Sequence, residues 1–275
     1  MGNIKYRIFW HLATFICAFI YFSGIYLLYK NWRLKRKHFI LIVLTYHRIR
    51  DDHKESDITV PVDFFDRQLI FLKAHYQIVS LDHLLQYRDG LKELDSDAVS
   101  ITFDDGYQDN YLKGFPLLKK YNIPATIFLV NQWINENEEF LTFEQIKEMG
   151  DHNIVFGSHT LSHPILSEIN EKAAYHEIYD SKFELERKLK CEIHYFAYPK
   201  GKAKHINESN IASVKQAGYK ASFTTENGLI DQVSDKCRLK RLGIRECPLF
   251  VFKVRTSGIF ETGIILFFRK MIGMV

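Results

Sequence analysis

Beyond residue 38, short apolar runs alternate with longer stretches whose apolar residues recur at helical spacing. The first run, Phe39 to Tyr46, is almost continuously apolar, as expected for a strand of a parallel sheet that is covered on both faces. The next stretch, Phe64 to His75, carries Phe65, Leu69 and Leu72 on one helical face. The same reasoning predicts further strands at Ala98 to Phe103, Ala125 to Val130, Ile154 to Gly157, Tyr195 to Tyr198 and Ala221 to Thr224, and helices near Tyr111 to Tyr121, Phe143 to Met149, Glu171 to Leu189 and Glu208 to Ala217. This repeated β–α order predicts one α/β domain over residues 39–248, with a parallel sheet that is open or closed into a barrel.

The N-terminal segment has a different pattern. Residues Ile8 to Tyr29 form a run of 22 without a charged side chain, long enough to cross a bilayer as one helix. Because no small-residue cleavage site follows, we expect an uncleaved anchor within residues 1–38 rather than a removed signal peptide. More basic residues follow the run than precede it, which predicts a single-pass protein of the bacterial cytoplasmic membrane whose C-terminal domain faces the cytoplasm. The opposite orientation stays open.

The C-terminal segment, residues 249–275, is also strongly apolar and ends in I-F-E-T-G-I-I-L-F-F-R-K-M-I-G-M-V. It either lies on the membrane as an interfacial helix or closes the bottom of a barrel, and periodicity does not separate the two. The net charge is only +4, with the basic residues concentrated near the N-terminus. This distribution argues against a nucleic-acid-binding surface.

Two motifs carry the candidate chemistry: T-F-D-D-G from Thr102 to Gly106, and H-T-L-S-H from His159 to His163. Each follows a predicted strand, and α/β folds place their active sites at the carboxyl ends of parallel strands. Gly106 permits a sharp turn after the strand. Because neighbouring residues at a strand end point in different directions, one carboxylate can bind a metal while the other faces the bound water. If the second motif is helical, both histidines lie on one side of a turn and reach the same metal. Two imidazoles and one carboxylate leave a coordination position open for water, which predicts a metal-dependent hydrolase.

With these motifs the chain resembles the polysaccharide deacetylase family, also called the NodB-homology or carbohydrate esterase 4 family. The first family motif is matched letter for letter, and the second has the form H-[ST]-x-x-H. A third motif is found in altered form as F-A-Y-P-K-G, from Phe196 to Gly201. The resemblance spans residues 41–244. It implies a distorted (β/α) barrel and metal-dependent removal of N-acetyl groups from amino sugars.

The resemblance also implies a role for each motif residue. Asp104 becomes the general base, which takes a proton from the metal-bound water. The metal, expected to be zinc, is assigned three ligands: Asp105, His159 and His163. The N–H of Lys200 is placed where the family stabilises the oxyanion, and Tyr198 and Pro199 are placed in a wall of the substrate groove.

Two departures from the family pattern shift roles to other residues. Ala197 replaces the arginine of the third motif, and Arg241 is our candidate for the group that orients Asp104 instead. The family's late histidine, which protonates the leaving amine, has no counterpart near the C-terminus. T-Y-H-R-I, from Thr45 to Ile49, resembles the Y-H-x-I of family members that deacetylate poly-N-acetylglucosamine, which makes His47 the candidate general acid. The alternative for His47 is a packed histidine at a strand end.

Together these features predict a membrane-anchored N-deacetylase that acts on an N-acetylated glycan or glycolipid, either a surface polysaccharide or a lipid-linked precursor. A metal-dependent phosphoesterase or glycosidase is a rival hypothesis, and release of acetate rather than phosphate or reducing sugar distinguishes them. A catalytically impaired glycan-binding module is a second rival, favoured by the missing arginine and late histidine. The intact motif residues argue against that module: Asp104, Asp105, His159 and His163.

Overall fold

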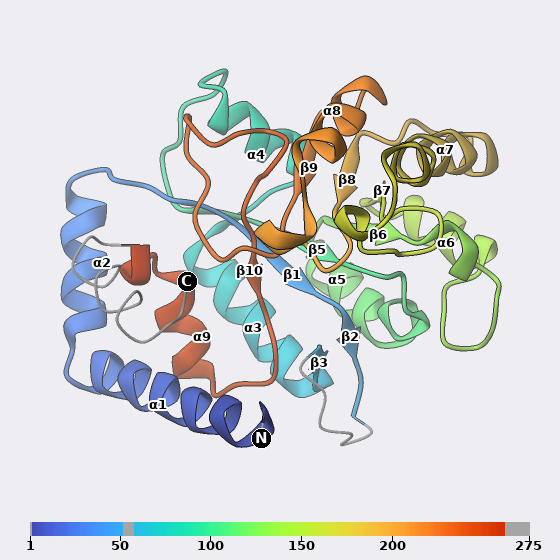
Figure 1. The fold of residues 1–275 in the computed structure, drawn as a ribbon. Helices are drawn as coiled ribbons and strands as arrows, with labels where there is room; N and C mark the ends of the chain where they lie inside the picture. Colours follow the sequence, from blue (N-terminus) through green and yellow to red (C-terminus); the bar gives the residue numbers. More distant parts are fainter. Residues whose placement is uncertain (1, 52–57, 262–275) are drawn as a thin grey trace. The chain divides into compact units, whose positions relative to one another are not determined.

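The computed structural model describes residues 2–51 and 58–261, and the chain divides into two units (Figure 1). The first, which we call the sheet unit, comprises Leu41–Glu246 and contains all the strands found among the described residues. The second, which we call the terminal unit, consists of Met1–Ile40 and Cys247–Val275, of which residues 2–40 and 247–261 are described.

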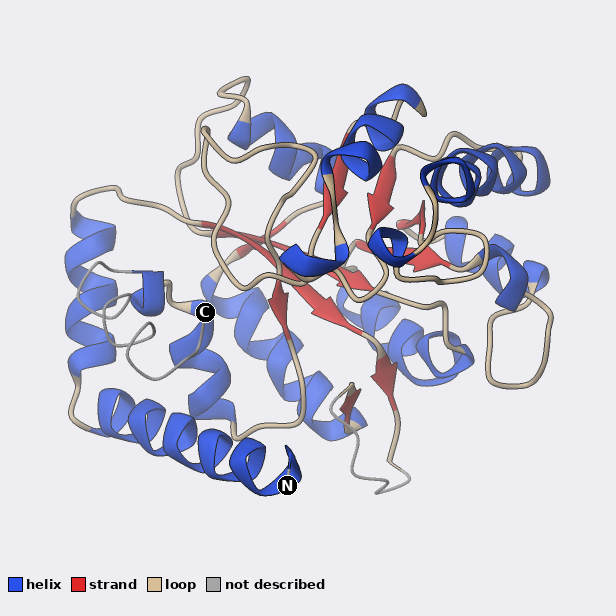
Figure 2. Cartoon of the chain, viewed as in Figure 1, coloured by secondary structure: helices blue, strands red, loops and turns tan. Residues whose placement is uncertain are grey.

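The sheet unit is built on one curled parallel sheet flanked by helices (Figure 2). The strands lie in the order β10, β1, β5, β6, β7, β8 and β9, and β4 adds to β5. Their bounds are β1 (Leu41–Tyr46), β4 (Gln77–Ile78), β5 (Ala98–Phe103), β6 (Ala125–Leu129), β7 (Ile154–Ser158), β8 (Tyr195–Ala197), β9 (Ala221–Phe223) and β10 (Leu242–Gly243). A separate parallel pair consists of β2 (Arg48–Ile49) and β3 (Thr59–Val60). Because the strands of the main sheet are parallel, their carboxyl ends meet at one edge.

Burial on both faces explains why the central strands β1 and β5 are mostly apolar. Every residue of β1 and β5 is buried, and Phe65, Leu69 and Leu72 of α3 are buried as well. The flanking helices are α3 (Val62–His75), α4 (Leu81–Arg88), α5 (Phe115–Tyr121), α6 (Phe143–Gly150), α7 (Glu171–Leu189) and α8 (Glu208–Gln216). Side-chain N-caps begin four of these helices: Ser80, Thr142, Asn170 and Asn207.

The elements predicted from the sequence are confirmed in order and largely in extent. β5 and α7 have the predicted bounds, and the other predicted strands differ by one or two residues at an end. The helix predicted over residues 111–121 instead begins as a π-helical turn, Asn110–Gly114, before α5. The apolar pattern does not predict α4. It does not predict the two-residue strands either, because two residues show no periodicity.

The stretch from Leu239 to Gly243 contacts both β9 and β1, which lie near opposite ends of the strand order. Leu239 exchanges backbone hydrogen bonds of 2.8 and 2.9 Å with Thr224 and Ser222, at the end of β9. Three residues later, β10 pairs with β1. Arg241 lies between these two attachments and is fully buried. The two attachments of the backbone therefore hold the Arg241 side chain inside the curled sheet.

The terminal unit contains α1 (Gly2–Phe22), α2 (Ile25–Lys35), α9 (Leu249–Thr256) and a 3₁₀ turn, Ile259–Glu261. The single helix predicted over residues 8–29 is not found: the chain turns at Gly24, whose φ is 83°, and the two helices are bent by 66°. Among the described residues, no single helix has the length and hydropathy of a membrane span. Only α1 and α2 taken together have that length and hydropathy. Of the predicted C-terminal segment, residues 249–256 form α9, and residues 262–275 lie outside the described residues.

Candidate active site

The two aspartates follow β5 in a tight turn. Asp105 and Gly106 both have positive φ values, 75° and 74°, a conformation that is uncommon for aspartate and unstrained for glycine. A Cβ at Gly106 would lie 2.9 Å from Leu129 Cδ2, so this close approach favours glycine. The turn gives the carboxylates different partners, because Asp104 pairs with Arg241 while Asp105 lies beside two histidines.

The histidine motif follows β7, and it is not helical. Thr160 and His163 have positive φ values of 73° and 65°, which a right-handed helical turn does not contain. The Thr160 hydroxyl accepts a hydrogen bond from the His163 N–H at 2.9 Å and closes the turn. Glu177 of α7, which the sequence motifs do not single out, accepts two further backbone N–H groups of the turn, both at 2.9 Å. These bonds bring both histidines together without a helix.

Asp105, His159 and His163 form a group that fits a divalent metal. One potential ligand atom from each lies within 4.8 Å of the others, and both Nε2 atoms are 3.4 Å from Asp105 Oδ1. Among the described residues, this buried Oδ1 has no hydrogen-bond donor, as expected for an oxygen that binds an ion. His159 Nδ1 lies 2.7 Å from the Ala197 carbonyl oxygen, which places the proton on Nδ1 and leaves the Nε2 lone pair free to bind. Two imidazoles and a carboxylate are typical zinc ligands.

The electrostatic surroundings suit this group. Burial, together with the neighbouring His159, lowers the pKa of His163 to about 4, so this imidazole is neutral at pH 7. Burial raises the pKa of Asp105, but the adjacent histidines outweigh it, and the net direction is downward. For His159, burial lowers the pKa, but Asp105 and Asp104 outweigh burial and raise it. A bound cation would replace the proton that these carboxylates attract to His159.

The structure places Arg241 directly against Asp104. Its Nη1 and Nη2 atoms donate to Oδ1 and Oδ2 of Asp104, both at 2.7 Å, and its Nε donates to the Thr224 carbonyl oxygen at 3.0 Å. Both side chains of the pair are essentially inaccessible to solvent. Burial raises the pKa of Asp104, but the charges of Arg241 and His159 lower it more, so the carboxylate is ionised at neutral pH.

His47 lies beside Asp104, in the chain between β1 and β2. Its Nε2 is 4.0 Å from Asp104 Oδ2, and its side chain is 23% exposed. The Asn110 side chain donates to the His47 carbonyl oxygen at 2.7 Å, and Asp109 binds the Arg48 side chain at 2.9 Å. The turn that follows the aspartate motif therefore fixes the backbone of His47 while leaving its ring accessible.

The third motif is divided between the surface and the core. Lys200 is exposed and has a left-handed φ of 59°, and its backbone N–H has no acceptor among the described residues. Tyr198 is fully buried and donates from its hydroxyl to the Cys237 carbonyl oxygen at 3.0 Å, and Pro199 is buried beside it. The two residues predicted to form a groove wall, Tyr198 and Pro199, are therefore not on the surface. A buried tyrosine hydroxyl needs a hydrogen-bond partner inside the core, and the Cys237 carbonyl oxygen supplies it.

A row of half-buried aromatic side chains lies beside the metal-binding group. The Trp133 ring centroid is 5.0 Å from that of His163 and 4.7 Å from that of Phe140. Phe140 stacks on Tyr107 at 5.4 Å, and the Arg48 guanidinium lies 4.3 Å from the centroid of the Tyr107 ring. Tyr107 follows β5, whereas Trp133 and Phe140 follow β6, so no single local motif reveals the row.

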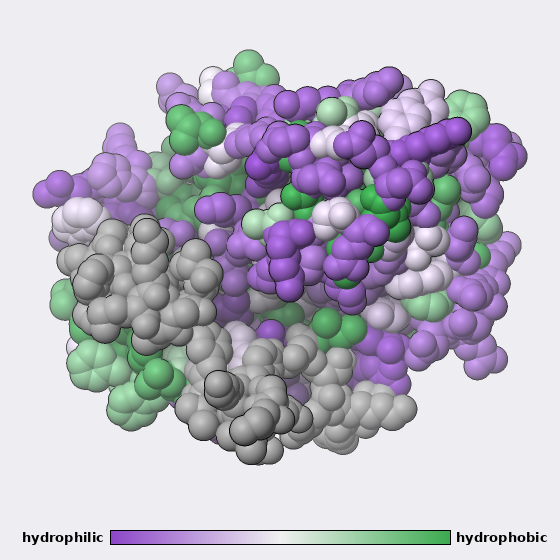
Figure 3. All heavy atoms as spheres, in the orientation of Figure 1, coloured by the Kyte–Doolittle hydropathy of each residue, from purple (hydrophilic) through white to green (hydrophobic). Residues whose placement is uncertain are grey.

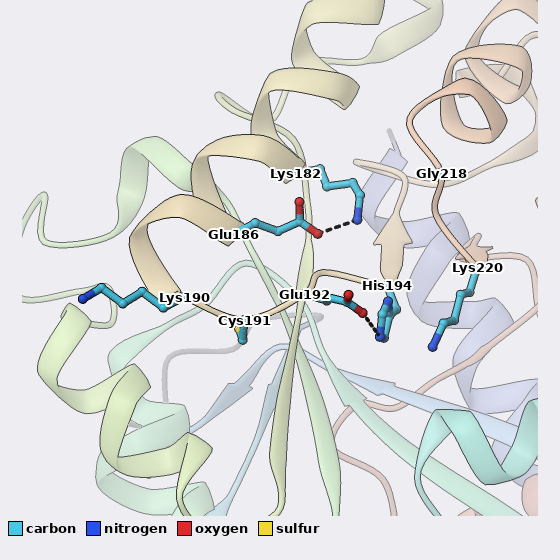
Figure 4. A pocket seen from close by; sticks show the side chains of 8 residues that line it. All are labelled: Lys182, Glu186, Lys190, Cys191, Glu192, His194, Gly218 and Lys220. Atoms are coloured by element: carbon cyan, nitrogen blue, oxygen red, sulfur yellow. Dashed lines mark hydrogen bonds and ion pairs between the residues drawn. The ribbon is translucent and has the colours of Figure 1, made fainter.

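A separate surface hollow lies at the opposite ends of the strands (Figure 4). Its lining comes from the end of α7 and from residues just before β8 and β9. Lys182 pairs there with Glu186, and His194 pairs with Glu192. Because the motif residues follow the carboxyl ends of β5 and β7, this hollow is not part of the candidate active site.

Comparisons with known proteins agree with this geometry. The family model described as polysaccharide deacetylase matches residues 92–222. YxkH of Bacillus subtilis (strain 168), which is named for this family, is 31% identical over 214 residues, or 78% of this chain and 74% of YxkH. The poly-β-1,6-N-acetyl-D-glucosamine N-deacetylase of Staphylococcus epidermidis is 28% identical over 240 residues, covering 78% of this chain and 82% of the relative. The solved structure of the Streptococcus pyogenes deacetylase PplD in complex with acetate has a TM-score of 0.70 and 27% identity, covering 74% of this chain and 92% of PplD.

The fold and the site define a hydrolase whose carboxylates and histidines meet at the carboxyl edge of a curled parallel sheet. With the similarity to YxkH, they show that the chain belongs to the polysaccharide deacetylase family, carbohydrate esterase 4. The protein is therefore a hydrolase of carbon–nitrogen bonds in acetylated sugars, which confirms the enzyme class predicted from the sequence.

Proposed function

We propose that the enzyme is a metal-dependent N-deacetylase of a surface polysaccharide, with β-1,6-linked poly-N-acetylglucosamine as the first candidate. The observation that carries this proposal is the group of Asp105, His159 and His163 beside the buried pair of Asp104 and Arg241. The name of the staphylococcal relative supports the choice of sugar. The half-buried aromatic row offers an apolar surface on which a sugar ring can pack. A lipid-linked glycan with the same sugar is the second candidate, because the terminal unit exposes apolar helices.

The first half of the reaction requires an electrophilic carbonyl and a base. A divalent cation bound by Asp105, His159 and His163 would polarise the acetyl carbonyl and acidify a water molecule. Asp104 accepts the proton of the attacking water, and Arg241 holds both carboxylate oxygens so that this group is ionised and fixed in place.

The second half requires charge stabilisation and a proton donor. The Lys200 N–H donates to the former carbonyl oxygen as negative charge develops on it, a contribution that is typically about 3 kcal/mol. His47 then gives a proton to the sugar nitrogen as the carbon–nitrogen bond breaks. The products are acetate and the free amine of the sugar.

Acetate release from defined oligosaccharides tests the proposal. We expect the full-length zinc-loaded enzyme to deacetylate β-1,6-linked N-acetylglucosamine oligomers faster than β-1,4-linked ones, with an undecaprenyl-linked N-acetylglucosamine as the lipid-linked comparison. Chelation should abolish acetate release, and added Zn²⁺ should restore it. Release of phosphate or of new reducing ends without acetate would establish the rival hydrolase chemistry. Binding of oligomers without any product would establish a glycan-binding module.

The metal ligands give a separate prediction. His159→Ala and His163→Ala should each weaken Zn²⁺ binding by roughly 100-fold or more and remove nearly all acetate release, because each deletes one donor atom. His176→Ala is the matched control, since His176 is an exposed histidine that forms an ion pair with Asp180 on α7. Full activity of either site variant with no bound metal would refute metal dependence.

His47 gives a prediction about the leaving group. His47→Ala should slow deacetylation of an N-acetyl sugar by about 10²- to 10⁴-fold, because the departing amine then receives no proton from this side chain. The metal content should stay unchanged, because His47 is not one of the three ligands. Hydrolysis of 4-nitrophenyl acetate should be much less affected, because its leaving group needs no proton. Equal losses on both substrates would show that His47 does not act as the acid.

A further inference from the structure

One side of α1 and α2 exposes large apolar side chains. On α1 these side chains recur at helical spacing, and similar side chains follow on α2 after the bend. We call this set the apolar face. Its members are 49% to 73% exposed: Phe15, Phe19, Phe22, Leu27, Leu28 and Trp32. Figure 3 shows hydrophobic atoms gathered over this part of the terminal unit. Soluble proteins rarely leave such a surface without a binding partner.

The opposite side of the same helices is occupied. Ala13, Cys17 and Ile20 of α1 are buried, and α1 packs against α9. The Tyr29 hydroxyl of α2 donates to the Gly258 carbonyl oxygen at 3.3 Å. This packing determines which sides of the helices face outward. The exposure of the apolar face therefore follows from how the terminal unit is packed.

The distribution of charge in the terminal unit matches a bilayer. Residues 8–29 carry no charged side chain, whereas Lys35, Arg36 and Lys37 are exposed at the end of α2. Acyl chains accommodate the uncharged part, and anionic headgroups attract the basic end. A protein partner would favour polar side chains around the apolar patch to form hydrogen bonds. From Trp10 to Phe22, α1 supplies no charged residue for such a rim.

We propose that the terminal unit is a monotopic membrane anchor whose apolar face lies in one leaflet of an anionic bilayer. In this arrangement the helices lie along the bilayer, because a bend of 66° separates them and, among the described residues, neither has by itself the length and hydropathy of a membrane span. The packing of α1 against α9, and of α2 against the 3₁₀ turn Ile259–Glu261, also opposes the straightening that a crossing helix would need. This anchor is an alternative to the single-pass topology predicted from the sequence, and it does not depend on the proposed deacetylation.

Vesicle flotation of the full-length protein tests the anchor. We expect binding to vesicles of phosphatidylcholine and phosphatidylglycerol, weaker binding to phosphatidylcholine alone, and a further loss at high salt. The variant Phe15→Glu/Phe19→Glu/Phe22→Glu should lower the bound fraction by roughly tenfold or more. Phe183→Glu is the matched control, because Phe183 is a similarly exposed phenylalanine, 63%, on α7 of the sheet unit. With folding verified by circular dichroism, a triple variant that binds like the wild type overturns the proposal.

Epitope tags at the two ends of the chain distinguish lying on the membrane from crossing it. A monotopic anchor places both tags on the same side of a sealed membrane vesicle, where protease removes both or neither. Tags on opposite sides would overturn the proposal in favour of a span. A second copy of the chain or its own residues 262–275 are the rival occupants of the apolar face. In either case the wild type would not float with vesicles, and the triple variant would change the oligomeric state or the thermal stability instead.

Discussion

Asp104→Asn is expected to lower acetate release by roughly 10³-fold or more while Zn²⁺ stays bound. Asparagine has nearly the shape of aspartate but does not accept the proton of the attacking water. Asp105 and the two histidines, which form the metal-binding group, are unchanged. Acetate release and metal content, measured on the same preparation, check both halves of the expectation. Loss of the metal from this variant would show that the roles of Asp104 and Asp105 are assigned wrongly.

The same substitution leaves the Arg241 charge buried without its counterion, so part of its effect is structural. We expect Asp104→Asn to lower the free energy of unfolding by about 3–5 kcal/mol. The double variant Asp104→Asn/Arg241→Met separates the two effects, because it removes both charges. Stability should recover and acetate release should not, whereas recovery of both would mean that Asp104 is needed only for folding.

Arg241→Met is expected to have the second-largest effect. The unpaired Asp104 carboxylate is then buried, which should lower the free energy of unfolding by about 3–5 kcal/mol. Without the guanidinium, the pKa of Asp104 rises and its carboxylate loses its fixed position, so turnover should fall by roughly 100-fold. Urea unfolding and the pH dependence of acetate release measure the two effects.

The stability contributed by the pair of Asp104 and Arg241 should fall on the acid side. Because the pKa of Asp104 in the folded state is below its ordinary value, the stabilisation by the pair is fully present above the ordinary carboxyl range. It is lost as the pH falls through the folded-state pKa. The Arg241→Met variant should lack this acid-side loss. Arg241→Lys is the control, because lysine keeps the charge but does not reproduce the bidentate contact. A Met variant with normal turnover and stability would show that another group orients Asp104.

The order of strands and helices could be predicted because burial imposes local patterns. β5 and α7 have the predicted bounds, since each combines an unbroken apolar or helical pattern with clear ends. The metal-binding group could be nominated because its members lie in two short motifs that each follow a strand. Parallel pairing brings the ends of β5 and β7 to one edge, so nearness in space followed from the predicted sheet.

Contacts between distant parts of the chain could not be predicted in the same way. The turn of His159 and His163 is held by Thr160 and Glu177 rather than by a helix, and Glu177 lies on another element. Tyr198 matches a motif position of a groove wall, but its hydroxyl finds its partner inside the core. A motif specifies which side chains are present and leaves open the direction in which each one points.

The sequence by itself determined the chemistry that is available: two adjacent carboxylates and two histidines with the spacing of metal ligands. Its alternation of apolar runs and helical stretches also predicted a covered parallel sheet. The tertiary structure alone decided which groups meet. Arg241 lies 137 residues after Asp104 in the chain, and it reaches Asp104 because the stretch that carries it hydrogen-bonds to β9 and then pairs with β1. It also decided that the apolar N-terminal run forms two helices with a bend between them, because Gly24 adopts a left-handed conformation and α1 packs against α9. Local patterns reflect burial and backbone preference, whereas pairings of this kind depend on the closure of the whole fold.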